Sequence, residues 1–277
     1  MRLSWGVSTM YFSILGALEM TQDDRVCTPT APKVRWTLAL LLVRANHIVG
    51  MDAIIEELWG NESPRSAVTT AQTYIYQLRK CFERESAGGP ESSPLETRPP
   101  GYLMRLERDQ LDANVFEHLV AEGKALLDDG RPEQAAQCLR RALGLWRGPA
   151  LANITPGRLL EAHVAHLEEM RIRAIELRIQ AESVLGRHRE MIPELRSLVA
   201  AHPLNEWLHG RLIDALHRAG RRGEALMAYQ NLRETLSEEL GLEPSGELQR
   251  LQRQVLTAGQ APVSRDAARV PVGALAR

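Results

Sequence analysis

The sequence has little that would place this protein in a membrane or outside the cell. Its longest uncharged apolar run, residues 36–43, is far shorter than the ~20 residues of a membrane-spanning helix. Residues 1–10 contain no apolar segment of the kind that a secretory signal needs. Only three cysteines occur, Cys27, Cys81 and Cys138, and their odd number and wide spacing exclude a disulfide framework and a CxxC zinc pattern. We therefore expect a cytoplasmic protein that binds no membrane.

Sequence motifs of catalysis are also missing. No GxSxG nucleophile motif and no GxxxxGK[ST] phosphate loop occurs, and no cysteine has a histidine beside it. His163, His166 and Glu168 lie on one helical stretch, but their spacing is not HExxH, so solvated helix residues are the favoured interpretation. We expect no enzymatic activity, no cofactor and no metal site.

Neither sign of charge dominates the chain. Lys and Arg total 34 and Asp and Glu total 35, which gives a net charge of -1. This balance excludes a protein that wraps nucleic acid with a wholly basic surface. Any contact with DNA must therefore come from a local basic patch.

The first part of the chain combines strand and helix patterns. Residues 10–30 have the pattern of a strand, a turn and a second strand, and helical spacing follows over residues 33–46. Asp52 is a candidate N-cap for a short helix over residues 53–59. A third helix is predicted over residues 64–84, because proline is favoured at the first helical position.

Two extended runs follow these helices. Residues 85–94 are rich in Gly, Ser and Pro and predict a flexible connection. Residues 95–106 predict a hairpin around Pro99-Pro100-Gly101. The order of short helix, longer helix and hairpin is that of a winged helix-turn-helix, in which one helix enters the major groove of DNA and the hairpin contacts the backbone or minor groove.

From residue 112 onward the strand signals almost vanish and one helix follows another. Gly-Arg turns occur at Gly130, Gly186 and Gly220, and the last two are one tetratricopeptide period of about 34 residues apart. The first interval is longer, so we expect an insertion or an elongated helix over residues 158–185. Ala225 and Tyr229 fall where the second helix of such a repeat packs a small and then a large residue.

The helix predicted over residues 64–84 has two unlike faces. On a helical wheel an apolar stripe is formed by Ala67, Ala71, Tyr74, Ile75, Leu78 and Phe82. The opposite face consists of Arg65, Thr69, Thr73, Tyr76, Gln77, Lys80 and Arg84. The segment has four basic residues and one acid, which is the composition of a recognition helix, although any solvated helix face can carry such residues.

The fold class that these patterns predict is mainly α, with an α+β winged helix-turn-helix followed by an all-α tetratricopeptide-like repeat. The predicted domains are an extension over residues 1–9, a DNA-binding domain over 10–110, a helical domain over 111–258 and a disordered tail over 259–277.

These patterns resemble one family in particular, the Streptomyces antibiotic regulatory protein family. The segments that carry the resemblance are residues 31–49, 57–82 and 97–112 for its DNA-binding domain and residues 130–151 and 194–252 for its bacterial transcriptional activation domain. Among them are ELWGNESPRSAVTTAQTYIYQLRKCF in the first domain and HPLNEWLHGRLIDALHRAGRRGEALMAYQNLRETLSEELGLEPSG in the second.

The resemblance implies an activator of antibiotic or other secondary-metabolite biosynthesis genes with an OmpR-type winged helix. Such proteins bind direct repeats near the -35 element and recruit RNA polymerase holoenzyme through its sigma factor and the C-terminal domain of its alpha subunit. Two protomers side by side must meet the same face of the duplex, so the repeats should be about 10 to 11 bp apart. The expected location is the cytoplasm, in association with the nucleoid.

The resemblance also assigns residues. The expected DNA-binding residues on the helix and the wing are Arg65, Ser66, Thr69, Thr73, Tyr76, Gln77, Arg79, Lys80, Arg84, Arg98 and Tyr102. The link that can touch polymerase in OmpR-type relatives corresponds to Gly60, Asn61, Glu62, Ser63 and Pro64.

Three features depart from the family pattern. Nine residues precede Met10, where relatives tend to begin, so Met1 and Met10 are both candidate starts. Larger relatives add a P-loop ATPase module. Because this sequence has no GxxxxGK[ST] motif, we do not expect nucleotide switching. Cys81 stands where alanine is common, and packing is favoured over redox chemistry.

Two alternatives stay open. A helical-repeat adaptor whose winged helix binds protein, without direct DNA readout, would have the same elements and would show no steep dependence of DNA affinity on salt. Trp146 and Trp207 could line an effector groove in the helical array, although aromatic residues in such places usually fill a core.

Overall fold

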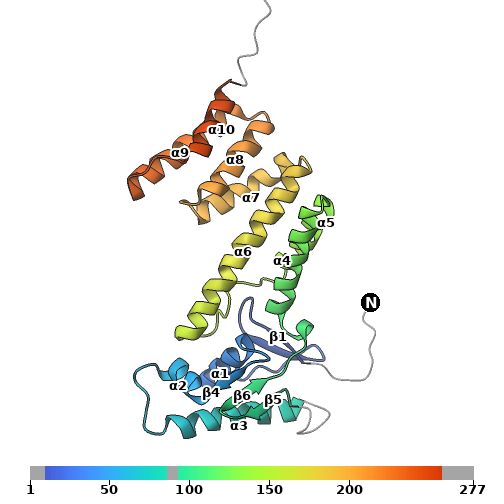
Figure 1. Ribbon diagram of the computed structural model, residues 1–277, viewed down its shortest axis with the longest axis vertical. Coiled ribbons are helices and arrows are strands. Elements are labelled where there is room, and N and C mark those ends of the chain that lie inside the picture. The colour runs from blue at the N-terminus through green and yellow to red at the C-terminus, as the bar shows by residue number, and fades with distance from the viewer. Residues whose placement is uncertain (1–9, 86–92, 258–277) are drawn as a thin grey trace, which may run out of the picture. The chain divides into compact units, whose positions relative to one another are not determined.

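The computed structural model describes residues 10–85 and 93–257 and shows two compact units, Met1–Ala181 and Glu182–Arg277 (Figure 1). Each unit is taken by itself below. In the described part of the chain, no helix is both long enough and apolar enough to cross a membrane.

Some sequence predictions fall outside the described residues. These are the extension over residues 1–9, the tail over 259–277 and most of the connection over 85–94.

The first unit opens with a small antiparallel sheet of order β1-β2-β3. Its strands are β1 (Met10–Ser13), β2 (Glu19–Gln22) and β3 (Arg25–Val26). Asp23 and Asp24 both have positive φ angles, 48° and 63°, which suits the tight turn between β2 and β3. The sequence predicts one strand before the turn, and the structure has two, separated by the loop around Gly16.

The winged helix-turn-helix follows, with its elements packed round one core (Figure 1). Its helices are α1 (Pro32–Val43), α2 (Met51–Trp59) and α3 (Ala67–Glu85). Its strands are β4 (Ile48–Gly50), β5 (Leu95–Arg98) and β6 (Gly101–Met104), which pair antiparallel in the order β4-β6-β5. The predicted hairpin is therefore confirmed, and β4 adds a third strand to it.

Two predicted helix starts are wrong. Gly50, not Asp52, is the N-cap residue of α2, because the helix begins directly where β4 ends. The third helix begins at Ala67, after a turn closed by a hydrogen bond of 2.9 Å from the Ala67 amide to the Pro64 carbonyl. Arg65 therefore lies in this turn and not on the helix.

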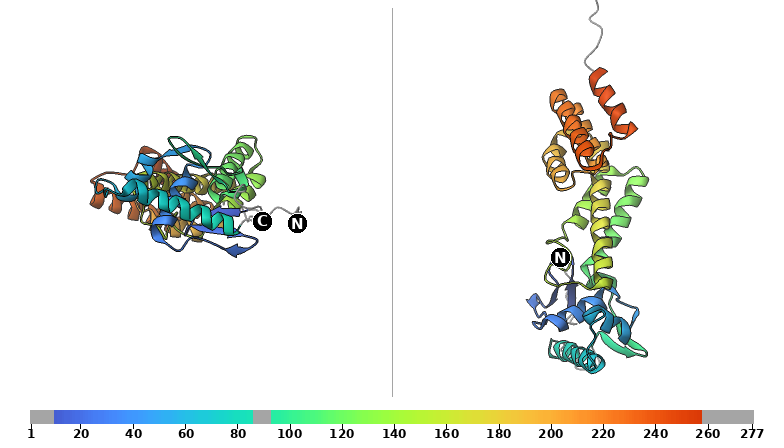
Figure 2. Two further views of the ribbon diagram at one scale, coloured as in Figure 1. Left: turned by 90° about the horizontal axis from the view of Figure 1, so that it is seen from below. Right: turned by 90° about the vertical axis from the view of Figure 1, so that its left-hand side faces the viewer.

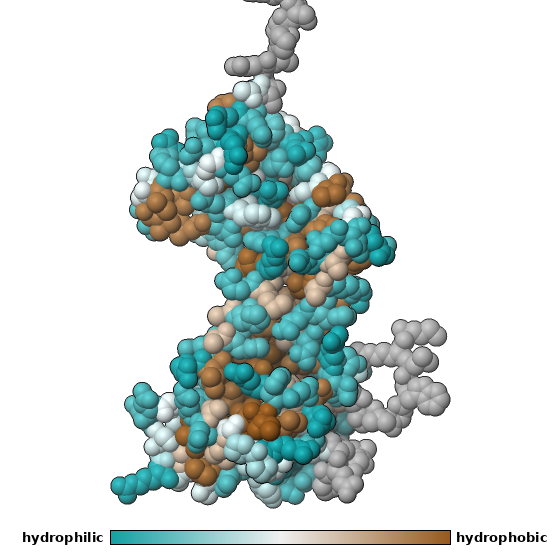
Figure 3. Space-filling model, in the orientation of Figure 1, coloured by the Kyte–Doolittle hydropathy of each residue, from teal (hydrophilic) through white to brown (hydrophobic). Residues whose placement is uncertain are grey.

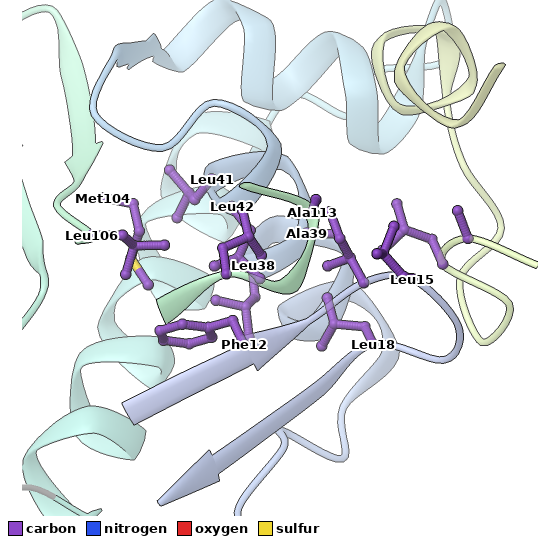
Figure 4. Close-up of a cluster of buried hydrophobic side chains, with 14 of the residues drawn as sticks. Phe12, Leu15, Leu18, Leu38, Ala39, Leu41, Leu42, Met104, Leu106 and Ala113 are labelled. Atoms are coloured by element: carbon purple, nitrogen blue, oxygen red, sulfur yellow. The ribbon is translucent and has the colours of Figure 1, made fainter. Parts of the chain in front are cut away.

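The same hydrophobic core continues beyond the wing. After the short 3-10 helix η2 (Arg108–Gln110) come α4 (Asp112–Asp128) and α5 (Pro132–Leu143), which pack as a pair, and then α6 (Arg158–Val184). Buried residues from Met10 to Leu177 form one cluster. In Figure 4, Ala113 of α4 gathers with Phe12, Leu38 and Ala39.

Hydrogen bonds fix the β1–β2 loop to the second half of this unit. The amides of Ile14 and Leu15 donate to the Asp112 carboxylate at 2.8 and 3.1 Å, and the Leu18 amide donates to the Asn153 side chain at 2.7 Å. Burial raises the pKa of Asp112, although these amides and Arg147 oppose the shift. The loop is therefore held by charge-assisted bonds as well as by the apolar core.

A buried carboxylate ties α2 to the start of α6. Glu57 accepts hydrogen bonds from the amides of Gly157 and Leu159, at 2.7 and 2.8 Å, and from the indole nitrogen of Trp36 at 3.2 Å. A Cβ atom on Gly157 would lie 2.5 Å from the Glu57 carbonyl oxygen. Only glycine therefore fits at position 157. We call the set of hydrogen bonds to the Glu57 carboxylate the Glu57 latch.

The second unit is a set of paired helices. They are α7 (His188–Ala201), α8 (Glu206–Arg218), α9 (Arg222–Leu240) and α10 (Gly246–Thr257). Gly186 and Gly220 have left-handed φ angles of 74° and 79° two residues before α7 and α9, and Gly130 has the same place before α5, so the predicted turns are confirmed. Ala225 and Tyr229 are buried in α9, and α6 is the elongated helix that the long interval predicts.

Candidate nucleic-acid interface

The inner face of α3 packs as the wheel predicts. Its buried residues are Ala67, Ala71, Ile75, Leu78 and Phe82. Tyr74, the remaining member of the predicted stripe, is only half-buried, and its ring stacks on Trp59 of α2 with 6.3 Å between ring centroids. The orientation of α3 is therefore fixed against α1 and α2, and its other face is left open.

The outer face of α3 is exposed and polar. Seen from below, α3 runs across the front of its unit with no other described element before it (Figure 2, left). The exposed predicted residues on it are Thr69, Thr73, Tyr76, Gln77, Lys80 and Arg84. The Thr73 hydroxyl donates to the Thr69 carbonyl at 2.9 Å, which leaves its oxygen free to accept and its methyl group free to contact a base.

The cations of this face are exposed, and each pairs with a partly exposed glutamate. Lys80 pairs with Glu83 and Arg84 with Glu85, each at 3.0 Å, and these carboxylates raise the pKa of both cations. Ion pairs of exposed cations contribute little to stability, so a phosphate group can replace the glutamates at little cost. Both side chains thus stay available for a polyanion.

The wing is anchored to the helices through Asn46. This residue has a φ angle of 64°, and its side chain exchanges two hydrogen bonds with the backbone of Leu106, at 2.9 and 3.1 Å. Its amide also donates to the Met104 carbonyl at 2.7 Å. The sequence gives no sign of this role, because Asn46 lies in an ordinary helix-to-strand link.

The wing carries one more arginine than the predicted set contains. Arg98 and Arg105 both pair with Glu96, at 2.8 Å each, and together they lower the pKa of that carboxyl. All three side chains are on the surface of the hairpin. Because one glutamate balances two arginines, the hairpin presents a net positive charge.

Arg79 does not share the outer face of α3. Its guanidinium donates to the Thr97 hydroxyl of β5 at 2.6 Å and lies over the Tyr102 ring of β6, 5.7 Å from the centroid. Two of the predicted DNA contacts, Arg79 and Tyr102, thus meet each other between the helix and the wing. We infer from these contacts that Arg79 positions the wing relative to α3.

If Arg79 positions the wing, Arg79→Gln and Thr97→Val should each weaken binding to a specific DNA site about tenfold, the loss of one charge-assisted bond. The double variant should be no weaker than Arg79→Gln alone, because both changes remove the same bond. Lys80→Gln combined with Thr97→Val serves as the control and should be additive. A double-mutant cycle from titrations on one DNA fragment measures this, and additive losses for Arg79 and Thr97 would show that the bond is irrelevant to binding.

The predicted polymerase-contact link lies on the surface next to the Glu57 latch. The residues of this link are Gly60, Asn61, Glu62, Ser63 and Pro64, and all of them are exposed. Gly60 has a φ angle of 55° and ends α2. A hollow of about 370 Å³ beside the link is lined by residues of α1, α2 and the start of α6, among them Trp36, Trp59 and Arg158.

The two histidines considered from the sequence as metal ligands differ in exposure. His166 is exposed, but His163 is half-buried, so the interpretation as a solvated residue is wrong for His163. Burial, His166 and Arg44 hold the pKa of His163 at about 4, below its ordinary 6.5. Among residues 10–85 and 93–257, no group of three or more His, Cys, Asp or Glu side chains is placed to hold a metal ion.

Cys81 lies on the flank of α3. It is half-buried, and its thiol is 3.7 Å from the Cys27 carbonyl oxygen. Burial raises the pKa of both thiols, that of Cys27 to about 11. Raised values make both thiols poor nucleophiles at neutral pH, in keeping with a packing role.

Comparisons with known proteins agree with this architecture. Residues 111–256 match the model of the bacterial transcriptional activator domain. The chain is 40% identical to the regulatory protein DnrI of Streptomyces peucetius over 268 residues, which are 96% of this chain and 98% of DnrI. It is 34% identical to the transcriptional regulator RedD of Streptomyces coelicolor over 88% of this chain and 69% of RedD.

A solved structure has the same fold. The structure of Mycobacterium tuberculosis EmbR in complex with low affinity phosphopeptide has a TM-score of 0.85 and 33% sequence identity to this chain, and the match covers 91% of this chain and 66% of EmbR. The predicted fold class is confirmed, with a small sheet and a winged helix before a helical array.

The fold and these matches define a bacterial transcriptional regulator that contains an activator domain. More narrowly, the chain belongs to the Streptomyces antibiotic regulatory protein family of transcriptional activators. Members of this family are regulators and not enzymes.

Proposed function

We propose that this protein is a sequence-specific DNA-binding activator of antibiotic or other secondary-metabolite biosynthesis genes. It binds double-stranded promoter DNA at direct repeats near the -35 element and recruits RNA polymerase holoenzyme through the sigma factor and the C-terminal domain of the alpha subunit. It works in the cytoplasm at the nucleoid, with a second protomer beside it on the DNA.

One observation carries the proposal above all. The exposed face of α3 presents hydroxyl, amide and cationic groups in one row, and the positively charged hairpin lies on the same unit. Thr73 and Gln77 are suited to base edges, whereas Lys80 and Arg84 are suited to phosphates. The net charge of the chain is only -1, so this local set supplies the attraction that the whole protein lacks.

Direct repeats are what membership of the family implies, and the geometry of the duplex sets their spacing. Successive protomers that point the same way along the duplex repeat after one helical turn, so half-sites about 10 to 11 bp apart bring them to one side of the DNA. The link Gly60–Pro64 is exposed on the same unit as α3 and remains the proposed contact with polymerase.

Base readout and phosphate contact can be separated by substitution. Thr73→Ala should weaken binding to the specific site by about 1 to 3 kcal/mol and leave random DNA unaffected, because it removes a base contact. Lys80→Ala should weaken both alike and lower the slope of log affinity against log salt by about 1, because it removes a phosphate contact. Titrations on a promoter fragment and on random DNA at several salt concentrations measure both effects.

Thr235→Ala is the matched control. Its hydroxyl makes the same bond to the carbonyl four residues earlier, at 2.9 Å, but lies on α9 in the second unit. It should leave promoter binding unchanged. A wild-type affinity for promoter DNA that hardly varies with salt would refute the proposal and favour the adaptor alternative.

A further inference from the structure

The end of α9 in the second unit leaves leucines in the open. Leu240, the last residue of α9, is 51% exposed, and Leu242 is 56% exposed. Leu204 before α8 is exposed as well, and a hydrogen bond of 2.7 Å from the Ser245 amide to Glu206 ties the start of α8 to the segment after α9. Figure 3 shows an apolar patch at this end of α9, bordered by hydrophilic residues. We call Leu204, Leu240 and Leu242 the leucine patch.

The exposure is not the result of an unformed helix end. Gly241 adopts a left-handed φ angle of 66°, and the amides of Gly241 and Leu242 donate to the carbonyls of Ser237 and Leu236, which closes the helix with a complete turn. The residue after such a glycine often packs back onto its own helix. Leu242 instead stays more than half exposed.

Glutamates bracket the two leucines in sequence. Glu238 and Glu239 come directly before Leu240, and Glu243 follows Leu242. Arg233 binds Glu243 through two hydrogen bonds, of 2.8 and 2.9 Å. Glu238 and Glu239 form no ion pair within the part of the chain that the structure describes. The surface around the leucine patch is therefore acidic.

This acidic surface is unfavourable for the isolated helix. The C-terminal end of a helix carries negative partial charge and favours basic residues. α8 in the same unit ends with His217 and Arg218, whereas α9 has no basic residue in its last turn and places Glu238 and Glu239 there. The exposed leucines and the glutamates that are unfavourable for the helix lie at the same end of α9. A partner surface that is both cationic and apolar would stabilise both.

We propose that the leucine patch and its glutamates form a docking surface for a cationic, apolar protein surface of RNA polymerase. The leucines would fill the dry centre of the contact, and the glutamates would pair with lysines or arginines at its rim. DNA is excluded as the occupant, because its phosphates are repelled by the same carboxylates. The proposal rests on the recruitment of polymerase set out under the proposed function, to which it adds a second surface.

The test uses the full-length chain, purified RNA polymerase holoenzyme and a promoter fragment. Leu240→Ser combined with Leu242→Ser should leave promoter affinity within twofold of wild type and lower polymerase retention on the promoter at least tenfold. Met227→Ser is the matched control, since Met227 is on α9 and 57% exposed but lies far from the leucine patch in sequence. It should behave as wild type.

A second pair of variants tests the charge. Glu238→Lys with Glu239→Lys should also lower polymerase retention, most strongly at low salt. Asp128→Lys with Asp129→Lys is the control, because these adjacent exposed acids end α4 in the other unit. Circular dichroism of each variant verifies the fold.

The outcomes distinguish the two proposals. Wild-type protein that binds the promoter without retaining polymerase would overturn both recruitment and this surface, whereas full retention by the Leu240 and Leu242 double variant would overturn the surface alone. Sedimentation velocity supplies a separate check. Self-association of the wild type that the double variant loses would assign the leucine patch to a second copy of the chain and overturn the polymerase assignment.

Discussion

Replacing Glu57 by alanine is expected to lower the free energy of unfolding by about 3 kcal/mol. Losses of about this size are found when one partner of a buried charged interaction is removed. Glu57 is only 2% exposed, and it accepts hydrogen bonds from the amides of Gly157 and Leu159 and from the indole of Trp36. Alanine leaves these donors without their acceptor. It also removes the carboxylate from the positive end of α6, a helix of 27 residues.

The neighbouring residue provides the control. Glu56 lies on the same helix and bonds Arg158 at 2.6 Å, but its side chain is 48% exposed. Glu56→Ala should therefore cost less than about 1 kcal/mol, as exposed ion pairs do. Urea denaturation followed by tryptophan fluorescence compares the two variants. Equal losses would show that the Glu57 latch contributes no more than a surface pair.

The Glu57 latch also bears on DNA binding. α2 carries Trp59, whose ring stacks on Tyr74 of α3, so a shift of α2 also shifts α3, the proposed recognition helix. Glu57→Ala should for this reason reduce promoter affinity more than Glu56→Ala does, although both residues lie on α2 and not on α3. The start of α6, within the matched activator domain, thus supports α2 and through it α3 by hydrogen bonds and ring packing.

Local sequence patterns predict much of this fold. The apolar spacing in α3 identifies the buried face correctly, because that spacing records which side must leave water. The Gly-Arg turns mark helix ends because only glycine adopts left-handed φ angles without strain, as at Gly186 and Gly220. The hairpin follows in the same way from two extended runs around Pro100-Gly101.

Contacts between segments that are far apart in the sequence cannot be predicted from local patterns. A wheel places Arg79 toward one flank of α3, but only the folded wing shows that Thr97 and Tyr102 occupy that flank. Glu57 resembles any glutamate on an amphipathic helix, because its partners are backbone amides about 100 residues further along the chain. The start of α3 at Ala67 is equally hidden, since a turn closed onto Pro64 replaces the expected first helical turn.

Gly101→Ala is the second substitution expected to have a large effect, with a loss of about 3 kcal/mol in the free energy of unfolding. Gly101 opens β6 and is paired with Gly50 of β4. A Cβ atom at Gly101 would fall well inside the contact distance of the Val49 carbonyl oxygen, and backbone cannot rotate away as a flexible side chain can. The strands must separate, and their hydrogen bonds are then strained or lost.

Gly50→Ala distinguishes this crowding from a general effect of glycine replacement. Gly50 lies opposite Gly101 in the same sheet, has ordinary backbone angles of φ -66° and ψ 153°, and has no atom within 4 Å of an added Cβ. Its replacement should change stability by no more than about 1 kcal/mol, because alanine fits these angles but is a poorer N-cap than glycine. Thermal unfolding and promoter titrations of both variants should separate them clearly. Because Gly101 pairs with Arg98 of β5 in the hairpin, only Gly101→Ala should also displace the wing and weaken binding to promoter DNA. Equal behaviour of the two variants would contradict the crowding at Gly101.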